Sequence, residues 1–504
     1  MAVLEMHGVG VAFAATTPVL EDASLRLVPG WYGLVGANGA GKTTLLRVLA
    51  GELAPDEGMV RREPRDASVL VCPQEIHERD DAIASFAASD DHVAVELRGR
   101  LELDPTDIDR WPTLSPGERK RWQIGAALAG APDVLLLDEP TNHLDVDARR
   151  LLVSALRRFH GVGVVVSHDR ALLEELPKTT IRVHNACVTA HAGGYGAAKA
   201  AWEQDRVARE DAHAQAKARV ASASARLAEA RREHASADRS RSSKTRMKDK
   251  NDHDARGMLA KGRAIAAEAK AGRTVGVRRA ELARAEDDVP VIERDRTLGG
   301  SVFASFERAR SPRLFHLDRE EVHAGGAAFA PVVLRDVRVT IGREDRVRIV
   351  GSNGAGKTTL LGALLEGGPP SERILHLPQE LEPAAVDALV RELHELGPDV
   401  RGRVLSVFAA LGSDPERILR RRASDAARLS PGEARKLALA LGLGRHAWAL
   451  VLDEPTNHLD LPSIERLERA LEEYPGAILL VTHDDAFAAA CTTRILRVEN
   501  GGVT

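Results

Sequence analysis

The chain has 504 residues, 44% of them hydrophobic, which excludes a disordered protein and allows two or three domains that each bury a core. Its formal net charge of −4 hides an uneven distribution, because residues 231–280 hold fifteen Lys and Arg against six Asp and Glu. Cys72, Cys187 and Cys491 lack the spacing of a disulfide framework or a zinc site. The N-terminus has no signal-peptide pattern and no apolar run approaches about 18 residues, so we expect a cytoplasmic protein.

Two copies of one series of motifs divide the chain. GANGAGKTTLL begins at Gly36 and GSNGAGKTTLL at Gly351, and LSPGE and LDEPTNHLD recur at the same offset of 315 residues. Apolar runs such as VLLLDEP and GVGVVVSHD are typical of strands that are buried on both faces of a parallel sheet. We therefore expect an α/β fold with two tandem P-loop NTPase domains, at residues 1–193 and 301–504.

The middle segment, residues 194–300, has a different composition. From Ala198 to Ala235 it is rich in Ala, Arg and Glu and contains no Pro or Gly, which predicts one long exposed helix. About 40 helical residues would span roughly 60 Å. Positive charge is concentrated after this helix, in RSRSSKTRMKDKND, which begins at Arg239. Several glycines then interrupt the chain before VRRAELARAEDD resumes a helical pattern.

Both copies contain a phosphate-binding loop of the form G-x-x-x-x-G-K-[ST]. In such a loop, backbone N–H groups at a helix N-terminus surround phosphate oxygens, the lysine reaches the terminal phosphates and the threonine hydroxyl binds magnesium. Each loop follows an apolar run, which favours this interpretation over a simple glycine-rich turn. The predicted ATP ligands are Gly36, Asn38, Gly39, Gly41, Lys42, Thr43 and Thr44 in the first copy and Gly351, Asn353, Gly354, Gly356, Lys357, Thr358 and Thr359 in the second.

Acidic residues end the strand that follows in each copy. An Asp at this place can bind a metal ion, and the Glu after it can polarise an attacking water. A His after the next strand can sense the terminal phosphate, and the Gln of PQE adds a ligand for nucleotide and metal. The predicted catalytic residues are Glu139, Glu454, His168 and His483, and the predicted metal ligands are Thr43, Gln74, Asp138, Thr358, Gln379 and Asp453.

The LSPGE motif allows two interpretations that are compatible. Ser and Glu three residues apart predict a capping box, with Pro at the first helical position. A capped helix N-terminus also binds anions, so Ser115, Gly117, Ser430 and Gly432 are predicted to hold the phosphate presented by the other half of the molecule. Phe13 could stack on adenine or pack in the core, and the sequence leaves both open.

With phosphate loop, glutamine, LSPGE, LDEPTNHLD and histidine in this order twice, the chain resembles the ATP-binding cassette (ABC) superfamily outside its middle segment. Two cassettes joined by a long basic linker, without a membrane domain, are similar to the ABC-F subfamily of ribosome-acting ATPases. The resemblance implies two ABC-type nucleotide-binding domains joined by a long α-helical hairpin, with ATP and Mg²⁺ as cofactors. It also implies a monomer whose cassettes pair, with one nucleotide between Lys42 and Ser430 and the other between Lys357 and Ser115.

The resemblance also implies a function for the linker, which in ABC-F proteins enters the tRNA exit site and approaches the peptidyl-transferase centre. The basic stretch, at about residues 239–258, is then the tip of the hairpin, and it contacts ribosomal RNA and tRNA. Its predicted RNA-binding residues are Lys244, Arg246, Lys248 and Lys250. The tip and the Pro in both LSPGE motifs look like those of members that protect the ribosome from antibiotics. Pro116 and Pro431 replace the usual Gly and remove one backbone donor, which leaves the hydrolysis rate open.

Other functions remain possible on sequence grounds. A housekeeping ABC-F translation factor would have the same motifs. The ATPase subunit of a transporter with separate membrane chains would have a short neutral linker, and a DNA-repair ATPase would have zinc cysteines or a longer coiled coil. The basic segment could also be only a solvated helix face.

Overall fold

The computed structural model describes residues 2–14, 17–142, 144–241, 255–290, 303–326, 330–352, 354–420 and 429–504. These residues form two compact units, of which the first combines Met1–Ala198 with Arg296–Thr504 and the second is Lys199–Asp295. Five residues predicted to bind ATP or RNA lie outside the described residues: Asn353, Lys244, Arg246, Lys248 and Lys250.

The first half of the chain is built on a six-stranded sheet with the order β5-β6-β7-β3-β8-β9. Neighbouring strands are parallel except β9, which is antiparallel to β8. The strands are β3 (Gly30–Gly36), β5 (Val69–Cys72), β6 (Val134–Asp138), β7 (Val162–Val166), β8 (Thr179–His184) and β9 (Cys187–Ala192). Helices α1 (Lys42–Ala50), α5 (Val146–Leu156) and α6 (Arg170–Glu175) follow β3, β6 and β7 respectively.

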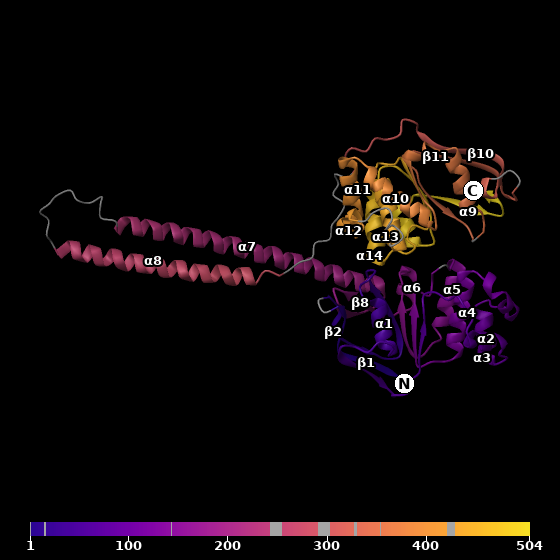
Figure 1. Cartoon of the computed structure of the whole chain (residues 1–504), viewed down its shortest axis with the longest axis horizontal. Helices are drawn as coiled ribbons and strands as arrows, with labels where there is room; N and C mark the ends of the chain where they lie inside the picture. Colours follow the sequence, from indigo (N-terminus) through magenta and orange to yellow (C-terminus); the bar gives the residue numbers. More distant parts are fainter. Residues whose placement is uncertain are drawn as a thin grey trace. The chain divides into compact units, whose positions relative to one another are not determined.

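Alternate residues of β6 enter different cores, which explains why its sequence is apolar throughout. Leu135 and Leu137 belong to the core that contains helix α5, whereas Val134 and Leu136 belong to the core that contains α1. Successive side chains of a strand point to opposite faces, so a sheet covered on both faces needs a continuous apolar strand. Figure 1 shows the helices of this half around its sheet.

The second half repeats this architecture, with the order β13-β14-β15-β12-β16-β17. Its strands are β12 (Arg346–Val350), β13 (Ile374–Leu377), β14 (Ala449–Asp453), β15 (Ala477–Val481), β16 (Arg494–Glu499) and β17 (Gly502–Val503). The matching helices are α9 (Lys357–Glu366), α14 (Leu461–Glu473) and α15 (Asp485–Cys491), with a short 3-10 helix η4 (Ser371–Arg373). The predicted α/β fold with two tandem domains is confirmed.

Each half adds a small antiparallel sheet. In the first half it has the order β2-β1-β4, and in the second it is the pair β10-β11. These strands are β1 (Val3–Ala14), β2 (Thr17–Leu27), β4 (Glu57–Glu63), β10 (Arg313–His323) and β11 (Val332–Gly342), with a 3-10 helix η3 (Ala324–Gly326) after β10. They pack into the same cores as α1 and α9 respectively.

Each half also has a group of helices between its second and third parallel strands along the chain. The first group is α2 (Asp81–Ala88), α3 (His92–Arg100), the 3-10 helix η1 (Pro105–Thr113) and α4 (Pro116–Ala129). The second group is α10 (Pro383–Glu395), α11 (Pro398–Ala410), α12 (Pro415–Leu419) and α13 (Pro431–Gly444). Helices α4 and α13 begin directly after the serine of each LSPGE motif, so this group presents the motif.

The second compact unit is a helical hairpin. Its helices are α7 (Tyr195–Arg241), which begins in the first unit, and α8 (Ala255–Asp287). They run antiparallel, because His213 Nδ1 lies 2.8 Å from the carbonyl oxygen of Pro290 and Gly272 faces His234. Figure 1 shows the two helices side by side. The long helix predicted from composition is confirmed, and no helix in the described part of the chain is both long and apolar enough to cross a membrane.

Candidate nucleotide-binding site

The two phosphate-binding loops have the same conformation. In the first, β3 ends at Gly36 and α1 begins at Lys42, and Gly41 between them has a φ of 104°. A Cβ atom at Gly41 would lie 2.7 Å from Val19, so the loop requires glycine there. No side chain caps α1, which leaves the N–H groups of its first turn available for an anion. The second loop repeats this at Gly356, which has a φ of 103° before α9.

The loop lysines lie across their own loops. Lys42 Nζ donates to the carbonyl oxygens of Gly36 at 2.8 Å and Ala37 at 3.1 Å, and the side chain is buried. Burial lowers the pKa of Lys42, and nearby carboxylates, Glu139 first, oppose that shift. Lys357 Nζ makes the corresponding contact with Gly351 at 2.8 Å. Each ammonium group therefore lies beside the place where the loop can hold phosphate.

A threonine hydroxyl and a buried aspartate meet at each loop. Thr358 Oγ1 donates to Asp453 Oδ2 at 3.2 Å, and the hydroxyl of Thr43 makes a hydrogen bond with Asp138. Burial raises the pKa of both aspartates. Hydroxyl and carboxylate oxygens are the ligands that Mg²⁺ prefers, and a divalent cation would stabilise the buried carboxylate charge. The residues present therefore fit a magnesium ion.

Glu139 follows the first of these aspartates and contacts the predicted phosphate sensor. Its Oε2 accepts a hydrogen bond from the backbone N–H of His168 at 3.2 Å, and its Oε1 lies 3.2 Å from His168 Nε2. Burial raises the pKa of Glu139 to about 8. Burial, together with the charge of Lys42, lowers the pKa of His168 to about 3. Burial therefore favours the neutral form of both side chains.

The second half has the same pair in a looser form. Glu454 Oε2 accepts from the backbone N–H of His483 at 3.3 Å, and His483 Nε2 lies 3.6 Å from Glu454 Oε1. Burial raises the pKa of Glu454 to about 7 and lowers that of His483. An ionised carboxylate here is suited to orient and deprotonate a water that attacks a phosphate.

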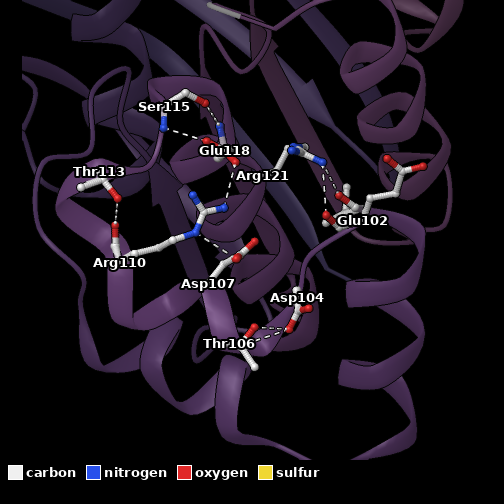
Figure 2. Close-up of polar contacts among 10 residues, drawn as sticks. Glu102, Asp104, Thr106, Asp107, Arg110, Thr113, Ser115, Glu118 and Arg121 are labelled. Carbon is white, nitrogen blue, oxygen red and sulfur yellow. Dashed lines mark hydrogen bonds and ion pairs between the residues drawn. The ribbon is translucent and has the colours of Figure 1, made fainter.

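The LSPGE motifs form the capping boxes expected from their spacing. Ser115 Oγ accepts from the backbone N–H of Glu118 at 3.2 Å, while the Glu118 carboxylate accepts from Ser115 N at 2.8 Å (Figure 2). Arg110 extends this network, because it lies 3.8 Å from Glu118 and donates to Asp107 at 3.0 Å. Ser430 makes the same box in the second half, with the backbone N–H of the matching Glu at 3.2 Å from its Oγ. Both motifs therefore have rigid helix N-termini.

The two halves contact each other at the first phosphate loop. The backbone N–H of Asn38 donates to Asp460 Oδ2 at 2.6 Å, and Asn38 Nδ2 donates to the carbonyl oxygen of His458 at 3.3 Å. A Cβ at Gly432 would lie 3.7 Å from the same amide nitrogen. The LSPGE motif of the second half, which we call the second signature, thus lies beside the phosphate loop of the first half. Sequence reasoning assigned no role to Asp460, although the Asp that ends both LDEPTNHLD copies, at 145 and 460, is a signal that could have found it.

One cavity of about 1570 Å³ joins these elements. Phe13 lines it and is 68% exposed, so the alternative that Phe13 packs in the core is wrong. Four predicted ligands that the structure describes do not line the cavity: Gly36, Gly351, Ser115 and Gly117. The predicted residues that line it are Phe13, Asn38, Gly39, Gly41, Lys42, Thr43, Thr44, Gln74, Asp138, Glu139, His168, Gly354, Gly356, Lys357, Thr358, Thr359, Gln379, Ser430, Gly432, Asp453, Glu454 and His483.

Comparison with known proteins agrees with this site. Residues 20–142 and residues 334–457 each match the family model described as ABC transporter. The chain is 30% identical to the tylosin resistance ATP-binding protein TlrC of Streptomyces fradiae, over 99% of this chain and 98% of that protein. It is 29% identical to the ribosome protection protein VmlR of Bacillus subtilis, over 94% and 82%. It is 27% identical to the energy-dependent translational throttle protein EttA of Mycobacterium tuberculosis, over 95% and 88%.

Solved structures show the same fold. The RNase-L inhibitor matches with a TM-score of 0.58 at 19% sequence identity, covering 99% of this chain and 89% of that one. At this identity the likeness concerns the fold alone.

Proposed function

The chain belongs to the ABC-F subfamily of ATP-binding cassette proteins and is an ATPase, and from this premise we propose that it acts on the ribosome to protect translation from an antibiotic. ATP, with Mg²⁺, binds at the two phosphate loops and drives the two cassettes together within one chain, and hydrolysis to ADP and phosphate releases them. The helical hairpin reaches toward the peptidyl-transferase centre and contacts ribosomal RNA and tRNA there. The protein works as a cytoplasmic monomer.

The observation that carries the proposal is the full-length match to a relative named for tylosin resistance, which includes the hairpin as well as both cassettes. The charges of the hairpin support it. Arg206 on α7 pairs with Glu203 and Glu210, and Arg278 on α8 pairs with Glu281 at 2.7 Å. Positive charge away from the tip is thus partly neutralised, whereas residues 239–258 include the four closely spaced cations predicted to bind RNA.

The experiment that tests ribosome binding is co-sedimentation with a non-hydrolysable ATP analogue across a salt titration. We expect alanine at Lys244, Arg246, Lys248 and Lys250 to weaken binding most at low salt. Four phosphate contacts contribute about 3 to the slope of log K against log salt, and the variant should lose that contribution. ATP hydrolysis without ribosomes should stay unchanged.

A matched control removes the same charge elsewhere in the hairpin, by alanine at Lys270, Arg273, Arg278 and Arg279 on α8. We expect a smaller loss of binding for this control. Equal loss in both variants would show that the net charge of the hairpin matters and the tip does not. No loss in the tip variant would contradict the proposed RNA contact.

A second assay separates antibiotic protection from a general role in translation. In cell-free translation inhibited by tylosin, the protein should restore synthesis if it protects ribosomes from this class of drug. The alternative of a translation factor rests on the similarity to the energy-dependent translational throttle protein EttA. That alternative predicts no recovery with tylosin or other drugs of the peptidyl-transferase region, and a change in uninhibited synthesis instead.

A further inference from the structure

Both helices that follow LSPGE carry a buried cation at the same position. Lys120 lies in α4, five residues after the serine of its motif, and Arg435 lies at the same place in α13. Lys120 is 3% exposed and Arg435 is 2% exposed. Lys and Arg side chains are rarely buried to this extent without a specific set of partners.

The partners of Lys120 are three backbone carbonyl groups from two other elements. Its Nζ donates to the carbonyl oxygens of Pro73 at 2.5 Å and Gln74 at 3.1 Å, in the segment after β5. It also reaches the carbonyl oxygen of Asp138 at 3.5 Å, at the end of β6. One ammonium group therefore joins three elements. They are helix α4 after the first LSPGE motif, the segment after β5 that contains Gln74 (the glutamine segment), and strand β6, which ends at the predicted metal ligand Asp138.

Arg435 makes the same connection with a guanidinium group. One terminal nitrogen donates to the carbonyl oxygen of Glu454 at 3.2 Å, and the other to those of Pro378 at 3.3 Å and of Gln379. The two halves thus reach one arrangement with different cations. Two of the three partners correspond, the Pro and Gln of each glutamine segment, while the third is Asp138 in the first half and Glu454, one residue further along, in the second. Burial of a cation in the same place twice, against the same segment, is difficult to explain by packing alone, since an apolar side chain could fill either position.

We propose that Lys120 and Arg435 are positioning residues for the metal-bound nucleotide. Each holds the backbone of its glutamine segment against the end of the strand that carries the acidic pair. The side chains of Gln74 and Asp138, or of Gln379 and Asp453, line the cavity and would hold a Mg²⁺ ion there, and the buried cation would fix the backbone that carries both ligands. Because Mg²⁺ demands near-ideal octahedral geometry, a small shift of either ligand weakens its binding.

A merely structural role makes a different prediction from a positioning role. Loss of the cation leaves three carbonyl groups without this donor, which lowers the stability of the fold in either case. Only if the cation has a positioning role should its removal also reduce the extent to which Mg²⁺ strengthens ATP binding. The test therefore compares ATP binding with Mg²⁺ to ATP binding in EDTA. It uses no ribosomes, so its outcome is independent of the proposed action on ribosomes.

The experiment measures binding of a fluorescent ATP analogue to the full chain in a Lys357→Ala background, in which only the first nucleotide site should bind. We expect Lys120→Met to reduce the ratio of Kd in EDTA to Kd in Mg²⁺ by about tenfold or more, which corresponds to about 1.4 kcal/mol. The Kd in EDTA should change less than about twofold. Lys120→Arg should restore the ratio, because the second half shows that a guanidinium group makes these contacts.

The control is Arg121→Met in the same helix and background. Arg121 donates to the carbonyl oxygens of Leu101 at 2.7 Å and Glu102 at 3.4 Å (Figure 2). It is not among the residues that line the cavity. The Arg121→Met variant loses the same kind of hydrogen bond, but not one to the segments that carry the predicted metal ligands. Its ratio of Kd in EDTA to Kd in Mg²⁺ should therefore stay at the parent value. Lys120→Gln keeps one donor and serves if Lys120→Met does not fold. An unchanged ratio in either folded Lys120 variant, or an equal fall in the Arg121 control, overturns the proposal.

Discussion

The raised pKa of Glu139 makes the stability of the nucleotide-free protein depend on pH, and the sign of this dependence follows from the direction of the shift. Burial raises the pKa of Glu139 from 4.5 to about 8. Between these values the folded chain keeps a proton that the unfolded chain releases, so stability falls as pH rises. Burial lowers the pKa of His168 from 6.5 to about 3. Between those values the unfolded chain holds the extra proton, so stability rises with pH.

The two effects have equal slopes of about 1.4 kcal/mol per pH unit and opposite signs. They cancel between pH 4.5 and 6.5, where both groups contribute, and only Glu139 acts between pH 6.5 and about 8. The parent should therefore lose up to about 2 kcal/mol of stability over that upper range. Glu454 adds little there, because its pKa is raised only to about 7.

The perturbation is Glu139→Gln, which removes the titration while keeping the shape of the side chain. Thermal unfolding at pH 6.5 and pH 8, without nucleotide, should show a smaller fall in the variant than in the parent. The exposed change Glu320→Gln serves as the control and should behave like the parent. Added Mg²⁺ and ATP should reduce the fall in the parent, since a nearby cation stabilises the ionised carboxylate. The same pH dependence in parent and Glu139→Gln would refute the reasoning.

Two further predictions concern hydrolysis and the pairing of the halves. Changing both Glu139 and Glu454 to Gln should lower ATP turnover by about 10² to 10⁴ while ATP still binds, measured by phosphate release and nucleotide retention; turnover at the parent rate would show that other groups activate the water. Ser430→Arg should reduce nucleotide occupancy at Lys42 more than at Lys357, because the second signature lies beside the first phosphate loop. Photo-crosslinking with site-resolved mass spectrometry measures this, and loss at Lys357 alone would contradict the pairing.

Local patterns were sufficient to predict the fold and the types of residue at the site. A glycine-rich loop, a strand that ends in two acids and a capping box each depend on residues close together in the sequence. The order of these motifs along both halves then placed them at one edge of each parallel sheet. This is why Lys42 and Asp138 could be expected near each other although almost a hundred positions separate them.

The features that could not be predicted depend on contacts between distant backbone groups. Lys120 and Arg435 look like ordinary surface cations in the sequence, because nothing local shows that backbone carbonyl groups from two other elements converge on them. Asn38 and Asp460 are 422 positions apart and meet only when the two halves pair. The burial of Phe13 could not be predicted for a different reason. A lone aromatic residue has no sequence pattern that distinguishes a place in the core from a place at the cavity.

Identical motifs do not give identical sites here, because burial differs between the halves. Lys42 is buried, whereas Lys357 is only partly so. Glu139 has a pKa raised to about 8, compared with about 7 for Glu454, with burial as the main cause in both. Without a bound cation, burial therefore opposes ionisation more strongly at the first carboxyl than at the second. If Glu139 activates the water as predicted, the first site would depend more strongly than the second on the charge of a bound metal ion to ionise this carboxylate. This is the half in which Lys120, a flexible ammonium group rather than a planar guanidinium, would position the predicted ligands of that ion.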